Sequence, residues 1–157
     1  MKKILIALMI FTVSGAAVFA ADAAKAPEKS AKQYIEDLSS TDEETVIAAE
    51  DWLGQKQEKG AVAKLLDLLK SDARTRVKMY AAVSLGLIGE KSAAEPMSEM
   101  ILSEQSADVR YATVLALGRI GIETKKAADN LTAAREKEND PFIKDFVTKM
   151  EEKFKGK

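Results

Sequence analysis

The sequence contains no cysteine and no histidine in its 157 residues. Without cysteine the chain has neither disulfides nor thiolate metal sites. Without histidine it lacks the commonest general base and the commonest metal ligand. Any chemistry would have to rest on carboxylates, lysines, tyrosines or hydroxyls. We therefore expect no catalytic, cofactor or metal site, and a protein that is not an enzyme.

Helix-breaking residues are also scarce, since the chain has only three prolines and eight glycines while 46% of it is hydrophobic. Alanine, leucine, glutamate and lysine are common, and all four favour helix. The formal net charge is −1, so no strong positive field attracts a nucleic acid. The composition predicts an all-α protein without a nucleic-acid partner.

The N-terminus has the pattern of a leader peptide. Lys2 and Lys3 precede an apolar stretch over residues 4–13, and small residues follow, with Val18 and Ala20 at the −3 and −1 positions of a cleavage site. We expect cleavage after Ala20, with Ala23 as the alternative site, which gives a signal peptide over 1–20, a flexible lead-in over 21–30 and a repeat domain over 31–157. A retained membrane anchor is the alternative interpretation. Cleavage predicts a periplasmic or secreted protein with no stable membrane insertion.

The chain repeats itself with a period of 32 residues. Residues 77–89 read VKMYAAVSLGLIG and residues 109–121 read VRYATVLALGRIG. Gly54, Gly86 and Gly118 occupy equivalent places, and leucine precedes each of them. A glycine inside a helix costs about 1 kcal/mol relative to alanine. Gly86 and Gly118 therefore predict the close approach of a neighbouring helix.

A second amphipathic pattern starts near residues 61, 93 and 127, between the first copies, so each unit is predicted to be two helices. A helix pair cannot bury its apolar face alone, whereas stacked copies cover one another. The predicted helices span 30–38, 42–54, 60–70, 73–88, 92–103, 107–120, 123–137 and 141–154.

Several residues indicate where these helices begin. Thr41 with Glu44, and Ser92 with Glu95, have the spacing of capping boxes. Asp140, which precedes a proline, is typical of an N-cap followed by the first helical residue.

The segments VKMYAAVSLGLIG and VRYATVLALGRIG resemble the second helix of HEAT repeats, of the short kind found in phycobilin-lyase-like proteins. The resemblance is strongest over residues 73–121 and weakest over 122–157. It implies a right-handed α-solenoid of about four helix pairs, whose second helices line a concave surface.

The second helices carry a core stripe and a separate apolar strip. The core stripe has helical spacing and comprises Val77, Ala81, Ser84, Leu85, Ile88, Val109, Thr113, Ala116, Leu117 and Ile120. The strip lies on the face that the resemblance makes concave, and comprises Ile47, Met79, Val83, Tyr111 and Leu115. An exposed apolar strip with an aromatic residue is typical of a partner-binding groove. The alternative is that the array buries the strip as core.

A column of basic residues recurs beside the stripe, at Lys78, Arg110 and Lys144. The resemblance implies that it contacts acidic or carbonyl groups of the adjacent repeat. A site for an anionic ligand is the alternative hypothesis. Val46 holds the corresponding place in the first repeat, so the column is incomplete.

Taken together, the repeats, the leader and the missing residue types predict a non-enzymatic interaction or scaffold module of the cell envelope. Its partner would be an unidentified envelope protein or peptide, bound along the concave face. Two alternatives remain open. The resemblance implies an enzyme or chromophore-handling protein related to the phycobilin lyases, and a retained leader implies an anchored structural protein.

Overall fold

A computed structural model describes residues 29–155, so the predicted leader and most of the lead-in lie outside the described residues. No helix in this part of the chain is long and apolar enough to cross a membrane. The described helices are α1 (Ala31–Asp37), α2 (Glu43–Gln55), α3 (Val62–Ser71), α4 (Thr75–Ile88), α5 (Ala94–Ile101), α6 (Ala107–Ile120), α7 (Lys125–Lys137) and α8 (Pro141–Lys155). Short 3₁₀ helices, Lys59–Ala61 and Lys91–Ala93, lead into α3 and α5.

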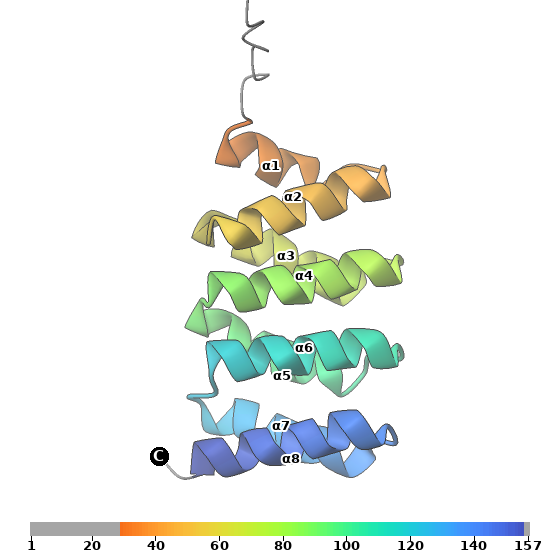
Figure 1. The fold of residues 1–157 in the computed structure, drawn as a ribbon, viewed down its shortest axis with the longest axis vertical. Coiled ribbons are helices and arrows are strands. Elements are labelled where there is room, and N and C mark those ends of the chain that lie inside the picture. The colour runs from red at the N-terminus through yellow and green to blue at the C-terminus, as the bar shows by residue number, and fades with distance from the viewer. Residues whose placement is uncertain (1–28, 156–157) are drawn as a thin grey trace, which may run out of the picture.

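The helices form four stacked pairs in two layers (Figure 1). The second helices of the pairs, α2, α4, α6 and α8, run side by side in one layer, and α3, α5 and α7 lie behind them. The strongest packing joins successive second helices, α2 to α4 and α4 to α6. This is the α-solenoid expected from the sequence. All eight predicted helices are present, with ends that differ by at most about two residues, the usual uncertainty of helix boundaries.

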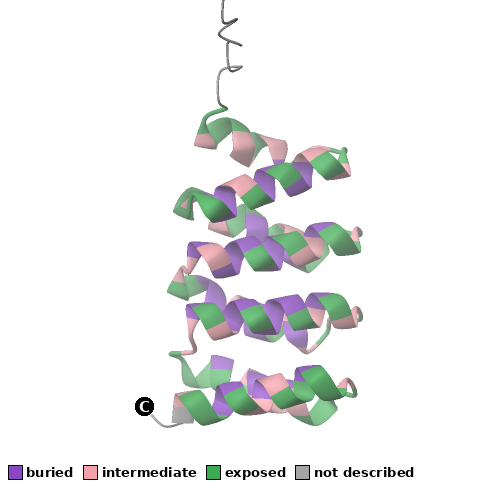
Figure 2. Cartoon of the chain, in the orientation of Figure 1, coloured by how far each residue is buried: buried purple, intermediate pink, exposed green. Residues whose placement is uncertain are grey.

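The core lies between the layers and between successive pairs. Every residue of the predicted core stripe on α4 and α6 is buried. Figure 2 shows buried positions recurring along α2, α4 and α6 between exposed ones. An inner second helix such as α4 packs against its neighbours α2 and α6 in the same layer and against α3 behind it, so only its outward side, away from the first helices, remains at the surface.

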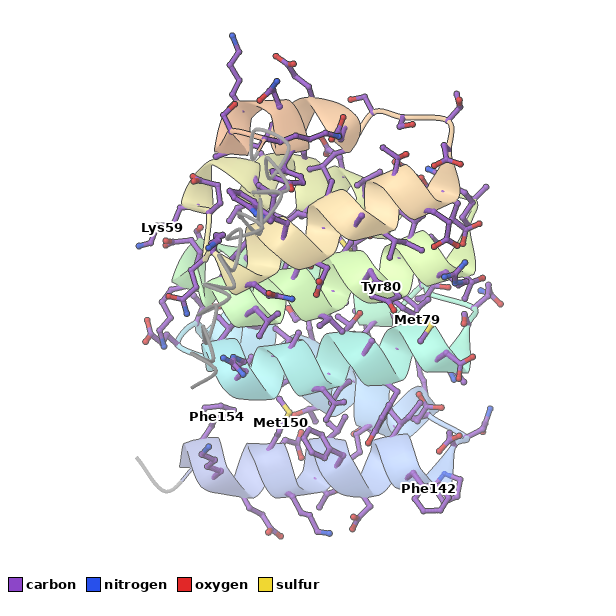
Figure 3. The ribbon with its side chains drawn as sticks, turned by 45° about the horizontal axis from the view of Figure 1, so that its top comes forward. Lys59, Met79, Tyr80, Phe142, Met150 and Phe154 are labelled. Atoms are coloured by element: carbon purple, nitrogen blue, oxygen red, sulfur yellow. The ribbon has the colours of Figure 1, made fainter. Side chains whose placement is uncertain are left out.

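Interior glycines permit this close stacking. A Cβ added to Gly86 would lie 2.9 Å from the Cα of Ala116, closer than carbon atoms approach in folded proteins. A Cβ on Gly118 would lie 3.3 Å from the sulfur of Met150, which points from α8 towards α6 (Figure 3). The close approach predicted at these two glycines is confirmed, and it is tightest at Gly86 because the neighbouring atom there belongs to the backbone.

The helix starts differ in part from the prediction. The N-cap of α2 is Asp42, whose carboxylate accepts a hydrogen bond from the backbone N–H of Thr45 at 2.8 Å. The capping box predicted at Thr41 is therefore wrong, because the cap lies one residue later. The box assigned to Ser92 is also wrong, because the chain there forms a 3₁₀ turn and α5 begins without a side-chain cap. The prediction for Asp140 is confirmed, since its carboxylate accepts two backbone N–H groups of the first turn of α8, at 2.9 and 3.2 Å.

Candidate protein-binding face

Exposed apolar side chains gather on one face of the molecule. Among the described residues, the large hydrophobic side chains that are exposed are Tyr80, Val83, Tyr111, Leu115 and Phe142. All five lie on second helices, α4, α6 and α8. We call the outward surface of α2, α4, α6 and α8 the even-helix face. Figure 3 shows Tyr80 on α4 and Phe142 projecting from the first turn of α8.

The strip predicted from the sequence is divided between this face and the core. Val83, Tyr111 and Leu115 are 48%, 43% and 40% exposed, so they belong to the open surface. Met79 is partly buried and packs against the core. The open part of the strip therefore lies over α4 and α6.

Ile47 does not contribute to the open surface, because it is only 7% exposed and belongs to the core. Its position explains the burial. Gly54 lies two turns further along the same side of α2, and a Cβ added to it would lie 2.9 Å from the Cα of Ser84 in α4. Ile47 thus lies on the side of α2 that α4 covers, and the apolar surface begins at α4.

Two hollows interrupt the even-helix face. The α4–α6 hollow has a volume of about 360 Å³ and is lined by Val83, Leu87, Leu115 and Arg119, among others. The α6–α8 hollow has a volume of about 270 Å³, and its walls include Asp108, Tyr111, Asp140 and Phe142. Each hollow combines large apolar side chains with charged ones, a composition that suits an apolar anchor flanked by a charge.

The charges at the two hollows are opposite in sign. Asp108 stands at the α6–α8 hollow and Arg119 at the α4–α6 hollow. Both are exposed, and neither forms an ion pair with another described residue. Asp140 also lines the α6–α8 hollow, although its carboxylate already caps α8. The face therefore offers one acidic and one basic contact point beside its apolar surface.

The basic column is held by ion pairs within the array. The Nζ of Lys78 lies 2.8 Å from a carboxylate oxygen of Glu104, and the guanidinium of Arg110 donates to both carboxylate oxygens of Glu138 at 2.8 Å. Each of these carboxylates also accepts a backbone N–H two residues further along its loop. The hydrogen bond from Arg110 holds the pKa of Glu138 below its usual value, against the opposing effect of burial.

The ends of the column differ from its middle. In the first repeat Val46 replaces the basic residue, and the loop carboxylate of Asp72 is paired by Arg74 at 2.7 Å instead. Lys144 is exposed and forms no ion pair with the described residues. The two central cations are engaged with carboxylates, so the column does not present a cluster of available positive charges to an anion.

A buried carboxyl group lies at the first repeat interface, and the sequence analysis missed it. Glu50 is 0% exposed, and neither of its carboxyl oxygens has a hydrogen-bond partner among the described residues. Burial raises its pKa to about 8, with a further increase from Asp72 and an opposing effect of Arg74. At neutral pH the side chain is therefore mostly protonated. Ala82 and Val114 hold the equivalent places in the next two repeats, and this apolar spacing was the signal that marked position 50 as interior.

The opposite layer carries a hollow of about 540 Å³ between α3 and α5. The pair of Lys78 and Glu104 forms part of its wall, together with Leu66 and Met100. No group of three or more acidic side chains in the described part of the chain could hold a metal ion.

Other residues of the even-helix face were also missed from the sequence: Tyr80, Asp108, Arg119 and Phe142. Helical spacing could have found the first, because Tyr80 precedes Val83 by three residues and so shares its side of α4. The repeat could have found Phe142, because it precedes Ile143 as the exposed Asp108 precedes Val109.

A comparison with protein families agrees with this architecture. The sequence profile of HEAT repeats matches residues 31–118 and again residues 62–146. Together the two matches cover most of the described helices. No curated protein matches the sequence. The chain belongs to the HEAT-repeat family, whose members generally mediate protein–protein interaction or scaffolding.

Proposed function

We propose that this protein is a non-enzymatic scaffold module of the cell envelope that binds a protein partner on its even-helix face. One observation carries the proposal: all the exposed large hydrophobic side chains of the described residues lie on α4, α6 and α8. Isolated surface hydrophobic residues are ordinary, but several gathered on one face are typical of an interaction site.

The location in the cell rests on the leader pattern of the sequence. Lys2, Lys3, the apolar stretch and Ala20 support export to the periplasm or beyond the cell. An exported chain must find its partner outside the cytoplasm. No observation favours the enzymatic alternative, and the absence of histidine and cysteine weighs against it.

Site-specific photo-crosslinking in living cells tests the proposed function. A photo-reactive amino acid replaces Tyr111, and the control probe replaces Lys64 of α3, in the opposite layer. We expect a discrete protein adduct from the Tyr111 probe alone. Folded protein that yields no adduct from Tyr111, or the same adducts from both probes, would contradict binding at the even-helix face.

A further inference from the structure

The two hollows of the even-helix face lie on a diagonal across three helices. One is between α4 and α6, towards the C-terminal ends of these helices, and the other is between α6 and α8, at their N-terminal ends. Neighbouring helix axes are about 8–10 Å apart. Along α6 the residues that line the two hollows are on average about seven residues apart, which is about 10 Å. The hollows are thus about 14 Å apart.

This spacing fits a helix and an extended chain differently. Residues on one side of a helix that are two to three turns apart, at i+7 to i+11, are about 10–17 Å apart. An extended chain covers about 14 Å in only four residues.

Backbone hydrogen bonding favours the helix. The even-helix face consists of α-helices, whose backbone groups are paired internally, so it offers no strand edge to a partner. An extended peptide pressed against this face would leave its own N–H and C=O groups without partners on the covered side. A helix satisfies these groups itself and presents only side chains.

Charge defines the partner further. Asp108 and Asp140 stand beside Tyr111 and Phe142, whereas Arg119 stands beside Val83 and Leu115. A partner helix that complements these groups carries a basic residue beside one apolar anchor and an acidic residue beside the other. Like charges in contact across the surface would oppose binding.

We propose that the even-helix face binds an amphipathic helix of a partner protein, with an apolar anchor in each hollow. Beside its anchors the helix carries a basic residue facing Asp108 and an acidic residue facing Arg119. This inference rests on the proposed function, because it specifies the partner for the same surface.

Defined peptides test the inference on the purified full chain. The probe is a fluorescent, alanine-rich peptide of about 18 residues, long enough to form a helix, with one apolar side, a lysine-rich end and a glutamate-rich end. The matched peptide has the same composition except for a central proline, which disfavours helix strongly. We expect the helical peptide to bind at least tenfold more tightly in anisotropy titrations. Equal affinities, or no binding by either peptide, would overturn the inference.

Protein variants test the hollows and the charges. Leu115→Asp should weaken binding of the helical peptide about tenfold or more, because it places a charge against an apolar anchor. The control Ala128→Asp, at an exposed position of α7 in the opposite layer, should leave binding unchanged. A peptide acidic at both ends should bind Asp108→Lys roughly fivefold more tightly than the unaltered protein. If Ala128→Asp weakens peptide binding as much as Leu115→Asp does, the apolar anchor is not in the α4–α6 hollow. If Asp108→Lys does not tighten binding of the peptide that is acidic at both ends, Asp108 does not face the partner helix.

Failure of this inference can be distinguished from failure of the proposed function. If the Tyr111 probe captures a protein in cells but the crosslinks from Val83 and Tyr111 probes fall about four residues apart in that protein, the partner is extended. In that case the helix is excluded and the binding face stands. Crosslinks to a second copy of this chain would likewise overturn the proposed partner. If the Tyr111 probe captures nothing, both proposals fail.

Discussion

At the scale of single residues, the unusual group is the carboxyl of Glu50, completely buried between the first and second repeats. A buried carboxyl without a hydrogen-bond partner is costly, and it costs much more when ionised. The protein avoids most of this cost at neutral pH because burial raises the pKa of Glu50 to about 8. The first repeat interface is consequently sensitive to pH.

The stability of the protein should therefore fall as pH rises from about 5 to 8. In this range folded Glu50 keeps its proton while the unfolded chain, with an ordinary pKa of 4.5, has lost it. The folded state binds more protons, so the free energy of unfolding decreases by up to about 1.4 kcal/mol per pH unit. In the variant Glu50→Gln, the free energy of unfolding measured by chemical denaturation should no longer fall with pH in this range.

The control for that experiment is Glu136→Gln, a change at an exposed position of α7. It should retain the slope of the unaltered protein. If Glu50→Gln also retains it, another group governs the pH dependence, and the account of Glu50 is wrong.

Residue-scale features were only partly predictable from the sequence. The glycine period identified Gly86 because close helix packing excludes a Cβ, and that requirement is visible as a repeated glycine. The cap of α2 was misplaced because Thr41 and Asp42 both have side chains that cap helices, and only the local backbone decides between them. Glu50 was missed because its carboxyl interrupts an otherwise apolar interior position.

At the scale of helices and loops, one device recurs through the array. Asp72, Glu104 and Glu138 each precede a second helix, and each binds both a loop N–H group and a cation. Lys78 and Arg110 supply the cation from the preceding second helix, so each pair joins one second helix to the loop that leads into the next. The device thereby fixes the position of the loop between successive repeats.

Removal of one cation should destabilise the array strongly. Arg110→Met leaves the carboxylate of Glu138, whose side chain is 4% exposed, without its partner. We expect the free energy of unfolding to fall by about 3 kcal/mol, as measured by urea denaturation. The loss should shrink as the pH falls below the ordinary carboxyl pKa of 4.5, since the lowered pKa of Glu138 makes the pair stabilising only while that carboxylate is ionised.

A surface pair provides the comparison. Lys125 pairs with Asp129 on α7, and both side chains are largely exposed. Lys125→Met should change stability little, because water and salt screen such pairs. A similar effect of Lys125→Met and Arg110→Met would contradict the structural role of the column.

The basic column was visible in the sequence, but its acidic partners were not assigned. Their signal was present, since Glu104 and Glu138 are 34 residues apart, as are Arg110 and Lys144. Acidic residues are abundant in charged helical proteins, so this spacing becomes informative only once the loops are placed beside the helices.

At the scale of the whole molecule, the periodic sequence dictates a stack of helix pairs, and the stack produces the even-helix face, which we propose to be the binding face. Successive second helices cover one another through the sides that carry Ile47 and Gly86, which leaves the sides with Val83 and Leu115 at the surface. The α-solenoid was predictable because period and apolar spacing repeat. The exact extent of the surface was not, because burial of Ile47 depends on how far α4 covers α2.

The measurement that tests the central claim most directly is the yield of partner crosslinked in cells from a probe at Tyr111, with and without Leu115→Asp. Because Leu115 is exposed, the variant should still fold, which its melting temperature would verify. We expect capture to be lost in the variant, since the charge lies within the apolar surface that the partner covers. Undiminished capture by the folded variant would contradict the claim that this apolar surface binds the partner.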